Sequence, residues 1–126
     1  RHDYVRTFVT RLDELEWDRL DAILAELRDE GERVLADERI PHSRRRYAVR
    51  FDCRYVKQYH EVSFAVSKTA LDQHDTVAIA HDFHTEHNRL YGYSLEAEGT
   101  PVELINVRLQ AVGARAGTLP GCGRFG

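Results

Sequence analysis

Histidines are the side chains in this sequence best suited to acid–base or metal chemistry, and the chain has seven. His81, His84 and His87 follow one another at intervals of three residues. A zinc site takes ligands at i and i+4 or from converging elements, and the sequence has no H-E-x-x-H motif. We therefore predict no metal site, with His60, His84 and His87 as the weaker alternative. His87 falls on an apolar helix stripe, which favours a core histidine that donates to a carbonyl or to Glu61.

The two cysteines show no sign of reactivity. Cys53 alternates with aromatic residues, a pattern typical of a buried small hydrophobe. Cys122 lies in a glycine-rich segment where nothing nearby would lower its pKa. Two cysteines are also too few for a disulfide framework.

Asp52 and Arg54 both point to the polar side of one predicted strand. They could form ion pairs with Arg108 or Glu103 on a neighbouring strand, or they could contact a substrate or a catalytic neighbour. The residues alone leave both interpretations open.

The sequence contains no recognisable nucleotide-binding or nucleophile motif. G-x-x-x-x-G-K-[ST], a strand followed by G-x-G-x-x-G, and G-x-S-x-G are all absent. We therefore assign no catalytic residue, expect this chain to bind no cofactor, and predict that the isolated chain has no ATPase, carboxylase or amidase activity.

A strand that changes its buried face lies at the centre of the sequence. From Tyr47 to Tyr55 the apolar residues occupy odd positions, whereas from Val62 to Val66 they occupy even positions. Such a change requires an inserted residue or a turn, and it must lie within 56–61, which includes Gln58. This segment is the first place to look for function.

Two helices are predicted around this strand. The first runs from Asp13 to about Ala36, with Asp13 and Glu16 resembling a capping box. Gly31 falls on its apolar stripe, which predicts close approach of another backbone. Asp29 and Arg33 are spaced for an ion pair on its solvated side.

The second helix is expected from Thr76 to Tyr91, with Asp75 as N-cap and Gly92 as a left-handed C-terminal cap. One face carries Ile79, Ala80, Phe83, His87, Leu90 and Tyr91.

A third strand is predicted over Val102 to Val112, with Ile105, Val107, Leu109 and Ala111 on one face. We expect Phe83, Leu90 and Ile105 to share a core with the central strand.

The order of these elements predicts a single small α+β domain over 1–126, with two main helices packed on a bent antiparallel or mixed sheet. Residues 1–11 are expected to form an extended or helical arm, and 113–126 a glycine-rich tail. The triplet Arg44 to Arg46 is interpreted as a solvated loop, with pairing to acidic groups as the alternative.

Three segments resemble the C-terminal domain of hydantoinase A, oxoprolinase and acetone carboxylase proteins. Residues 52–58 (DCRYVKQ) resemble D-M-R-Y-x-G-Q, with Cys53 in place of Met and Lys57 in place of Gly. Phe83, His87 and 91–93 resemble F-x3-H-x3-Y-G-Y, and residues 102–108 resemble V-E-[LI]-[VI]-N-[LV]-R.

The resemblance implies a part of a large enzyme that couples ATP hydrolysis to opening cyclic amides or carboxylating ketones. ATP and a divalent metal are then expected on partner subunits. The interpretation we favour here is the small subunit of an acetophenone carboxylase-like complex, a ligase that forms a β-keto acid from ketone, bicarbonate and ATP, with a structural role for this chain. The alternatives are a C-terminal fragment of a hydantoinase or 5-oxoprolinase, and a stand-alone binding module with a pocket lined by Tyr55, Gln58 and His87. The motif residues that could contact substrate or subunits are Asp52, Arg54, Tyr55, Gln58, Glu61, His87 and Tyr91.

Composition narrows the possible partners. With 18 basic and 21 acidic residues the net charge is −3, which favours neither nucleic acid nor an anionic membrane as a partner. No apolar run has the length of a transmembrane helix and no signal peptide opens the chain, so we expect a cytoplasmic protein. The chain begins at Arg1 without Met, which indicates that residues precede it or that it was cut from something longer. We expect larger ATP-binding and carboxylase subunits as partners, docked against the first helix through Leu20, Leu27 and Gly31 or against the termini.

Overall fold

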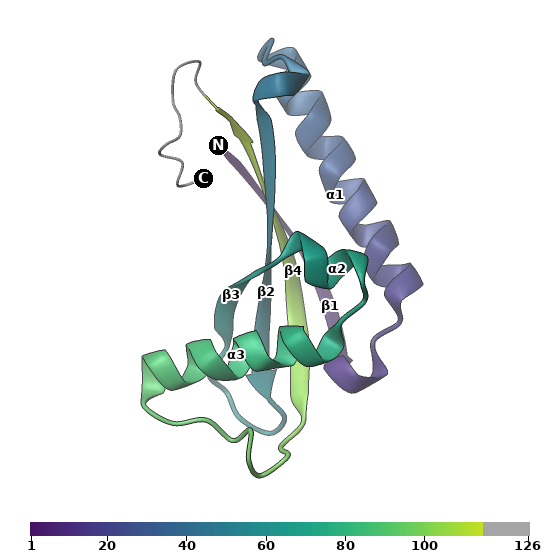
Figure 1. The fold of residues 1–126 in the computed structure, drawn as a ribbon. Helices are drawn as coiled ribbons and strands as arrows, with labels where there is room; N and C mark the ends of the chain where they lie inside the picture. The colour runs from purple at the N-terminus through teal and green to yellow at the C-terminus, as the bar shows by residue number, and fades with distance from the viewer. Residues whose placement is uncertain (115–126) are drawn as a thin grey trace.

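The computed structural model of the protein describes residues 1–114, which form a four-stranded sheet with two main helices (Figure 1). The strands are β1 (His2–Arg11), β2 (Arg45–Tyr55), β3 (Val62–Val66) and β4 (Val102–Gly113), and the helices are α1 (Trp17–Asp37), α2 (Lys68–Asp72) and α3 (Thr76–Tyr91). Single 3-10 turns cover Leu12–Glu14 and His42–Arg44. The strand order is β1-β4-β2-β3 and every pairing is antiparallel. The expected α+β class is therefore confirmed, with an antiparallel rather than a mixed sheet.

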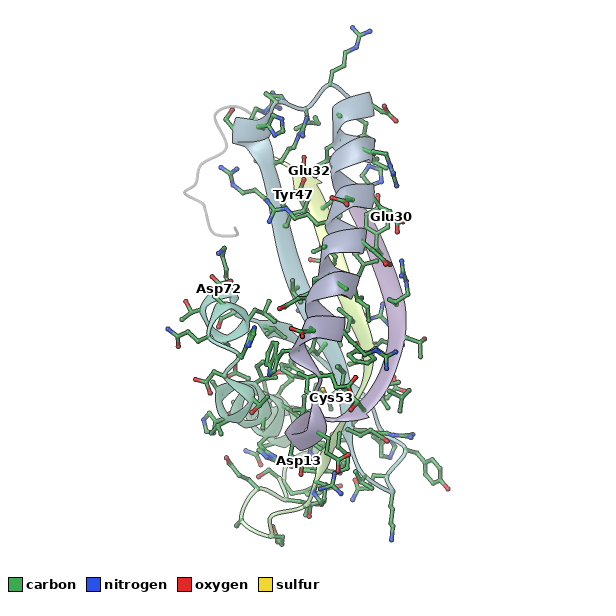
Figure 2. All side chains as sticks on the ribbon, turned by 90° about the vertical axis from the view of Figure 1, so that its right-hand side faces the viewer. Asp13, Glu30, Glu32, Tyr47, Cys53 and Asp72 are labelled. Carbon is green, nitrogen blue, oxygen red and sulfur yellow. The ribbon has the colours of Figure 1, made fainter. Side chains whose placement is uncertain are left out.

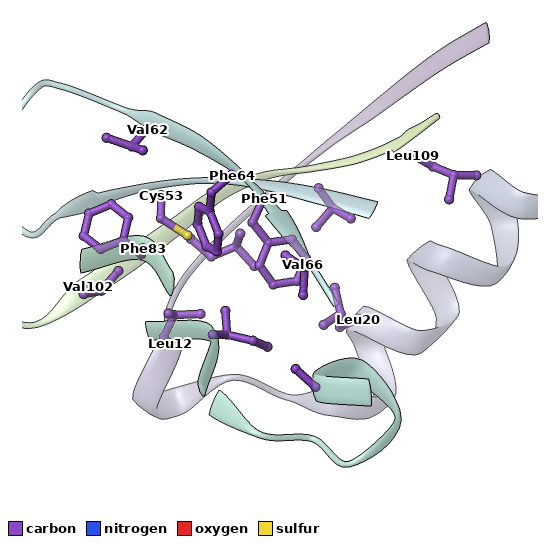
Figure 3. Packing of buried hydrophobic residues seen from close by; sticks show 14 of the residues in the cluster. Leu12, Leu20, Phe51, Cys53, Val62, Phe64, Val66, Phe83, Val102 and Leu109 are labelled. Carbon is purple, nitrogen blue, oxygen red and sulfur yellow. The ribbon is translucent and has the colours of Figure 1, made fainter. Parts of the chain in front are cut away.

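The helices lie on one face of the sheet and enclose the core. α1 packs on β4 and β1, and α3 packs on the edge strand β3. Between the layers, Phe51 and Phe64 meet edge to face, with ring centroids 6.3 Å apart (Figure 3). None of the helices within residues 1–114 has the length and hydropathy that a membrane span requires.

The change of face in the central strand is a hairpin. β2 and β3 pair from Cys53↔Val62 to Val49↔Val66, and the loop 56–61 joins them. The turn therefore lies within 56–61, as the change from odd to even apolar positions predicts. Both flanking strands bury the same side of the sheet.

α1 begins four residues later than predicted. Its N-cap is Glu16, which makes no side-chain capping bond, so the expected capping box is absent. The i,i+4 ion pair on this helix joins Arg28 and Glu32 (3.8 Å) rather than Asp29 and Arg33. The helix starts later because the chain first completes the 3-10 turn that leads out of β1.

The buried stripe of α1 is covered by the chain's own sheet. Leu20 and Leu27 are at most 1% exposed, and a Cβ built on Gly31 would stand 2.9 Å from the Cβ of Ala111 on β4. The predicted docking of a larger subunit on these residues is therefore wrong, because the close approach that Gly31 allows is to β4 and to Tyr47 on β2.

The N-terminal segment is a strand of the sheet. Residues 2–11 pair with β4, from His2↔Ala111 to Arg11↔Glu103. This segment therefore docks on its own chain, and nothing local in the sequence reveals a pairing partner about a hundred residues away. Of the predicted tail 113–126, Gly113 ends β4 and residues 115–126 lie outside the described residues.

β4 contains a bulge that changes which of its residues are buried. The pairing with β2 shifts between Asp52↔Asn106 and Cys53↔Leu104, so Ile105 is the extra residue. Val102 and Leu104 are buried before it, and Val107 and Leu109 after it. The prediction that Ile105 belongs to the core is therefore wrong.

α3 has the predicted bounds and both predicted caps. The Asp75 carboxylate accepts from Ala78 N (3.0 Å), and Gly92 is left-handed with φ 81°. Its C-terminal end extends beyond the edge strand β3 (Figure 1), so Leu90 and Tyr91 are 48% and 42% exposed instead of buried. The connector before α3 holds the short helix α2, which the sequence reading missed.

The basic triplet is ordered at the start of β2. Arg45 donates to Glu32 on α1 (2.6 Å) and to the carbonyl of Ile40 (2.8 Å). The hydroxyl of Tyr47 lies beside Glu32 in the same region (Figure 2), and burial together with this carboxylate raises the pKa of Tyr47. The interpretation of the triplet as a solvated loop is therefore wrong for Arg45, which pairs with an acidic residue of its own chain.

Candidate functional site at the hairpin loop and the end of α3

Residues from two of the motifs meet at one end of the sheet. The loop 56–61 faces the end of α3, where the Tyr93 hydroxyl lies 3.5 Å from Gln58 Oε1. The rings of His60 and Tyr91 are 5.3 Å apart between centroids. The third motif begins beside them, because Val56 N donates to the carbonyl of Pro101 (3.0 Å).

Tyr55 is the buried centre of this region. It is fully buried, and its ring meets the edges of Phe83 and His87 at 5.0 and 4.8 Å between centroids. Its hydroxyl accepts from Leu95 N (2.8 Å) and lies 2.7 Å from Nδ1 of His84. Burial of His84 lowers its pKa, which favours the neutral ring. The Tyr55 hydroxyl and Nδ1 of His84 are hydrogen-bonded, and the pair links β2, α3 and the chain after α3.

Sequence reasoning did not find this pair. His84 was considered only as a metal ligand, and its neighbours in sequence gave no signal of a tyrosine partner on β2. The only available signal was that His84 follows Phe83 on the core side of the helix.

His87 is the core histidine that the sequence predicted. It is 1% exposed, and its Nδ1 lies 2.9 Å from the carbonyl of Tyr93, to which it donates. The other expected partner, Glu61, is exposed on the hairpin loop. His87 thus ties the C-terminal cap of α3 to the helix that precedes it.

The three metal candidates are not gathered into a ligand set. Nδ1 of His84 is hydrogen-bonded to a hydroxyl and Nδ1 of His87 to a carbonyl, and the ring of His60 lies against that of Tyr91 at a tilt of 37°. Within residues 1–114, no group of three or more His, Cys, Asp or Glu side chains is arranged to hold a metal ion.

Lys57 occupies a backbone conformation that favours glycine. Its φ is 74°, in the left-handed region, at the position where the resembled motif has Gly. The next residue, Gln58, closes the turn by donating its N–H to the carbonyl of Tyr55 (3.0 Å). The hairpin therefore keeps the geometry of a glycine turn while carrying a lysine.

Asp52 and Arg54 form both ion pairs that strand pairing made possible. Arg108 Nε is 2.9 and 3.0 Å from the two oxygens of Asp52, and Asn106 Nδ2 donates to Oδ2 at 3.0 Å. The Asp52 side chain is only 4% exposed. Arg54 pairs with Glu103 at 3.0 Å, with both side chains partly exposed. These contacts fasten β2 to β4 on the sheet face opposite the helices.

Cys53 is fully buried, and burial raises the pKa of its thiol well above the usual value. The prediction of a buried cysteine is confirmed. Cys122 lies outside the described residues.

Acidic side chains stand at the N-termini of the two long helices. α1 begins with Glu16 as N-cap and carries Asp18 in its first turn, and the N-terminus of α3 is occupied by its own Asp75 carboxylate. Phosphate binding at a helix N-terminus needs free N–H groups without nearby negative charge. No step of a reaction that uses ATP can be assigned to these helix ends.

Together the fold and the motif positions define the class, a small α+β domain with a four-stranded antiparallel sheet and three motif segments that meet at one end of it. No protein-family model matches the sequence. The chain is homologous to one region of the caprolactamase subunit alpha of Pseudomonas jessenii, with 31% identity over 117 residues, which cover 89% of this chain and 16% of that subunit.

Solved structures agree with that assignment. The crystal structure of the ATP-dependent caprolactamase from P. jessenii matches 89% of this chain and 16% of its own, with a TM-score of 0.78 and 30% identity. The nucleotide-free acetone carboxylase structure matches with a TM-score of 0.54 and 11% identity, covering 90% of this chain and 18% of its own, which is a likeness in fold alone. The chain thus spans about a sixth of the length of these relatives.

Proposed function

We propose that this chain is the C-terminal domain, or a separate small subunit derived from it, of a larger ATP-dependent enzyme of the hydantoinase, oxoprolinase and acetone carboxylase type. The observation that carries the proposal is the 31% identity to the caprolactamase alpha subunit along 89% of the chain, together with a TM-score of 0.78. ATP and a divalent metal are bound by the rest of that enzyme, in the cytoplasm.

The role of this domain is structural. The motif side chains with the strongest chemistry already have partners within the domain: Tyr55 with His84, His87 with Tyr93, and Asp52 with Arg108. Each of these contacts joins two separate segments of the domain, which favours a stabilising role for the side chains involved. The domain would therefore support the assembly while the reaction takes place elsewhere.

Opening of a cyclic amide is the reaction class that we favour for the whole enzyme. The sequence relative at 31% identity is a caprolactamase, whereas the likeness to acetone carboxylase is one of fold. This preference reverses the order of the two reactions expected from the motifs. Ketone carboxylation, including the acetophenone carboxylase-like version, is the second candidate because the motifs resemble both kinds of protein.

A stand-alone binding module is the least favoured function. Its pocket needed Tyr55, Gln58 and His87 to line an opening, but Tyr55 and His87 are 0% and 1% exposed. A ligand at this point would have to displace the core.

The test is to purify the intact enzyme through a tag on this chain and to measure ADP release. We expect release to be stimulated by caprolactam or hydantoin, and not by acetone or acetophenone with bicarbonate. The chain alone is the control and should release no ADP above background. Stimulation by ketone and bicarbonate would exchange the two candidates, and substrate-dependent ADP release by the chain alone would overturn the structural role. The mass of the native polypeptide separates a fragment from a subunit.

A further inference from the structure

Large apolar side chains that the domain leaves exposed gather at the end of α3 and on the hairpin loop. Among residues 1–114, seven large apolar residues are exposed, and four of them lie here. We call these four the aromatic patch: Tyr59 (90% exposed), Leu90 (48%), Tyr91 (42%) and Tyr93 (43%). The two segments that carry them touch through His60 and Tyr91 and through Gln58 and Tyr93. Exposed apolar groups on neighbouring segments are typical of interaction sites, whereas scattered ones are normal.

The patch continues the buried stripe of α3. Ile79, Phe83 and His87 are covered by the sheet, whereas Leu90 and Tyr91 follow on the same predicted face and are not. The helix therefore extends an apolar face beyond the edge strand β3 (Figure 1). Residues 1–114 leave that part of the stripe uncovered, so a surface beyond these residues would be needed to bury it.

Two members of the patch, Tyr91 and Tyr93, are held in place by contacts within the domain. The ring of Tyr91 lies against His60 and His87, at 5.3 and 4.9 Å between centroids. Tyr93 is fixed by its carbonyl, which accepts from His87, and by the contact of its ring with His87 at 4.9 Å. Preorganised tyrosines lose little entropy on binding and are enriched among the residues that dominate interface energies.

We propose that the aromatic patch is the surface through which this domain docks on the larger ATP-dependent polypeptide, by an apolar and aromatic contact. The inference rests on the proposed function. The matched region is 16% of the caprolactamase alpha chain, so an enzyme of that kind offers a large body for the domain to contact. On the same helix, Glu86 and Arg89 already pair with each other at 2.6 Å, so each of these two charges has a partner within the domain.

A second copy of the chain fits the patch less well. A stable dimer buries about 800 Å² on each partner, from about 20–30 residues a side. Four side chains supply only the centre of such an interface. A larger polypeptide can make further contacts around these four side chains. In a dimer of this small domain, the same residues of both copies would have to supply all of those contacts.

The first test compares oxidative footprinting of the intact enzyme with that of the isolated chain. We expect Tyr59 and Tyr91 to be labelled about tenfold more slowly in the intact enzyme, as complete burial of a dominant interface side chain requires. Val77, which is 78% exposed at the other end of α3, is the control and should be labelled equally in both. Equal labelling of the patch in both samples would overturn the proposal. Protection in the isolated chain that increases with its concentration would overturn it in favour of a second copy.

The second test uses the double variant Tyr59→Ser/Leu90→Ser, with Val77→Ser as a matched control on the same helix. The patch variant should weaken association with the rest of the enzyme by about tenfold or more, and the control should leave it unchanged. Unchanged far-ultraviolet circular dichroism separates this loss from unfolding. Unchanged association of the patch variant would overturn the proposal.

The outcomes separate this inference from the proposed function. An enzyme that turns over ATP with caprolactam while the patch stays fully labelled refutes the docking surface alone. A protected patch in an assembly without ATP turnover refutes the proposed function alone.

Discussion

Replacing Gly31 with Ala tests the packing of α1 on the sheet. A Cβ at this position would stand 2.9 Å from the Cβ of Ala111 and 3.3 Å from Cε1 of Tyr47. Carbon atoms at optimal separation are about 3.5–4.0 Å apart, so the new methyl group requires a shift of roughly half an ångström or more. Ala111 cannot yield by changing rotamer, and its strand is fixed on both sides by His2↔Ala111 and Tyr47↔Ala111 pairing.

The expected free-energy change combines two opposing effects. Overpacking a close contact costs about 1–3 kcal/mol, and the cost lies near the upper end because the Cβ of Ala111 can move only with its strand. Alanine in a helix interior gains about 1 kcal/mol over glycine. We therefore expect Gly31→Ala to lower the free energy of unfolding by about 1–2 kcal/mol.

The assay is urea unfolding of the chain followed by circular dichroism, arranged as a double-mutant cycle with Ala111→Gly. Removing the opposing methyl group should restore part of the loss, giving a coupling energy of about 1–2 kcal/mol. Ala25→Gly, at an exposed position of the same helix, measures helix propensity alone and should cost about 1 kcal/mol. A Gly31→Ala variant more stable than the parent, with no coupling to Ala111, would refute the close packing of α1 on β4.

Three further predictions concern the site. Lys57→Gly should raise the free energy of unfolding by about 1 kcal/mol, because φ is 74°, whereas Gly92→Ala should lower it by a similar amount at φ 81°; thermal unfolding checks both. Asp52→Ala should cost about 1–3 kcal/mol in urea unfolding, because it removes a buried acceptor, whereas Glu103→Ala at the partly exposed pair should cost less than about 1 kcal/mol; equal losses would contradict the difference in burial. Burial lowers the pKa of His84 below the 6.5 of the unfolded chain, so as pH falls the unfolded state binds a proton first, and the free energy of unfolding decreases below pH 6.5. The variant His84→Gln should remove this part of the pH dependence of urea unfolding, and an unchanged profile would count against a buried neutral ring.

The sequence predicted those elements whose signals are local. Asp75 and Gly92 mark both ends of α3 within a turn of the helix, and the change of parity after Tyr55 located the hairpin. β1 was interpreted as an arm because its partner strand lies about a hundred residues away in sequence. A regular alternation along β4 predicts Ile105 in the core, but the bulge at this residue breaks the alternation.

The candidate site was predictable to the same extent. Alternation in the strands placed Asp52 on the polar side together with Arg108, and the structure forms that ion pair. The hydrogen bond between Tyr55 and His84 depends on the angle at which α3 crosses the sheet, and the sequences of β2 and α3 do not indicate that angle. The exposure of Leu90 depends in the same way on where β3 ends relative to the helix.

We propose that this chain supports an ATP-dependent enzyme without binding ATP itself. The most direct measurement is ATP turnover by the intact enzyme, purified through a tag on this chain, beside the chain alone at equal concentration. We expect ADP formation by the intact enzyme in the presence of a cyclic amide, and no ADP formation above background by the isolated chain. Stoichiometric nucleotide binding and turnover by the chain alone, or an intact assembly that never hydrolyses ATP, would contradict it.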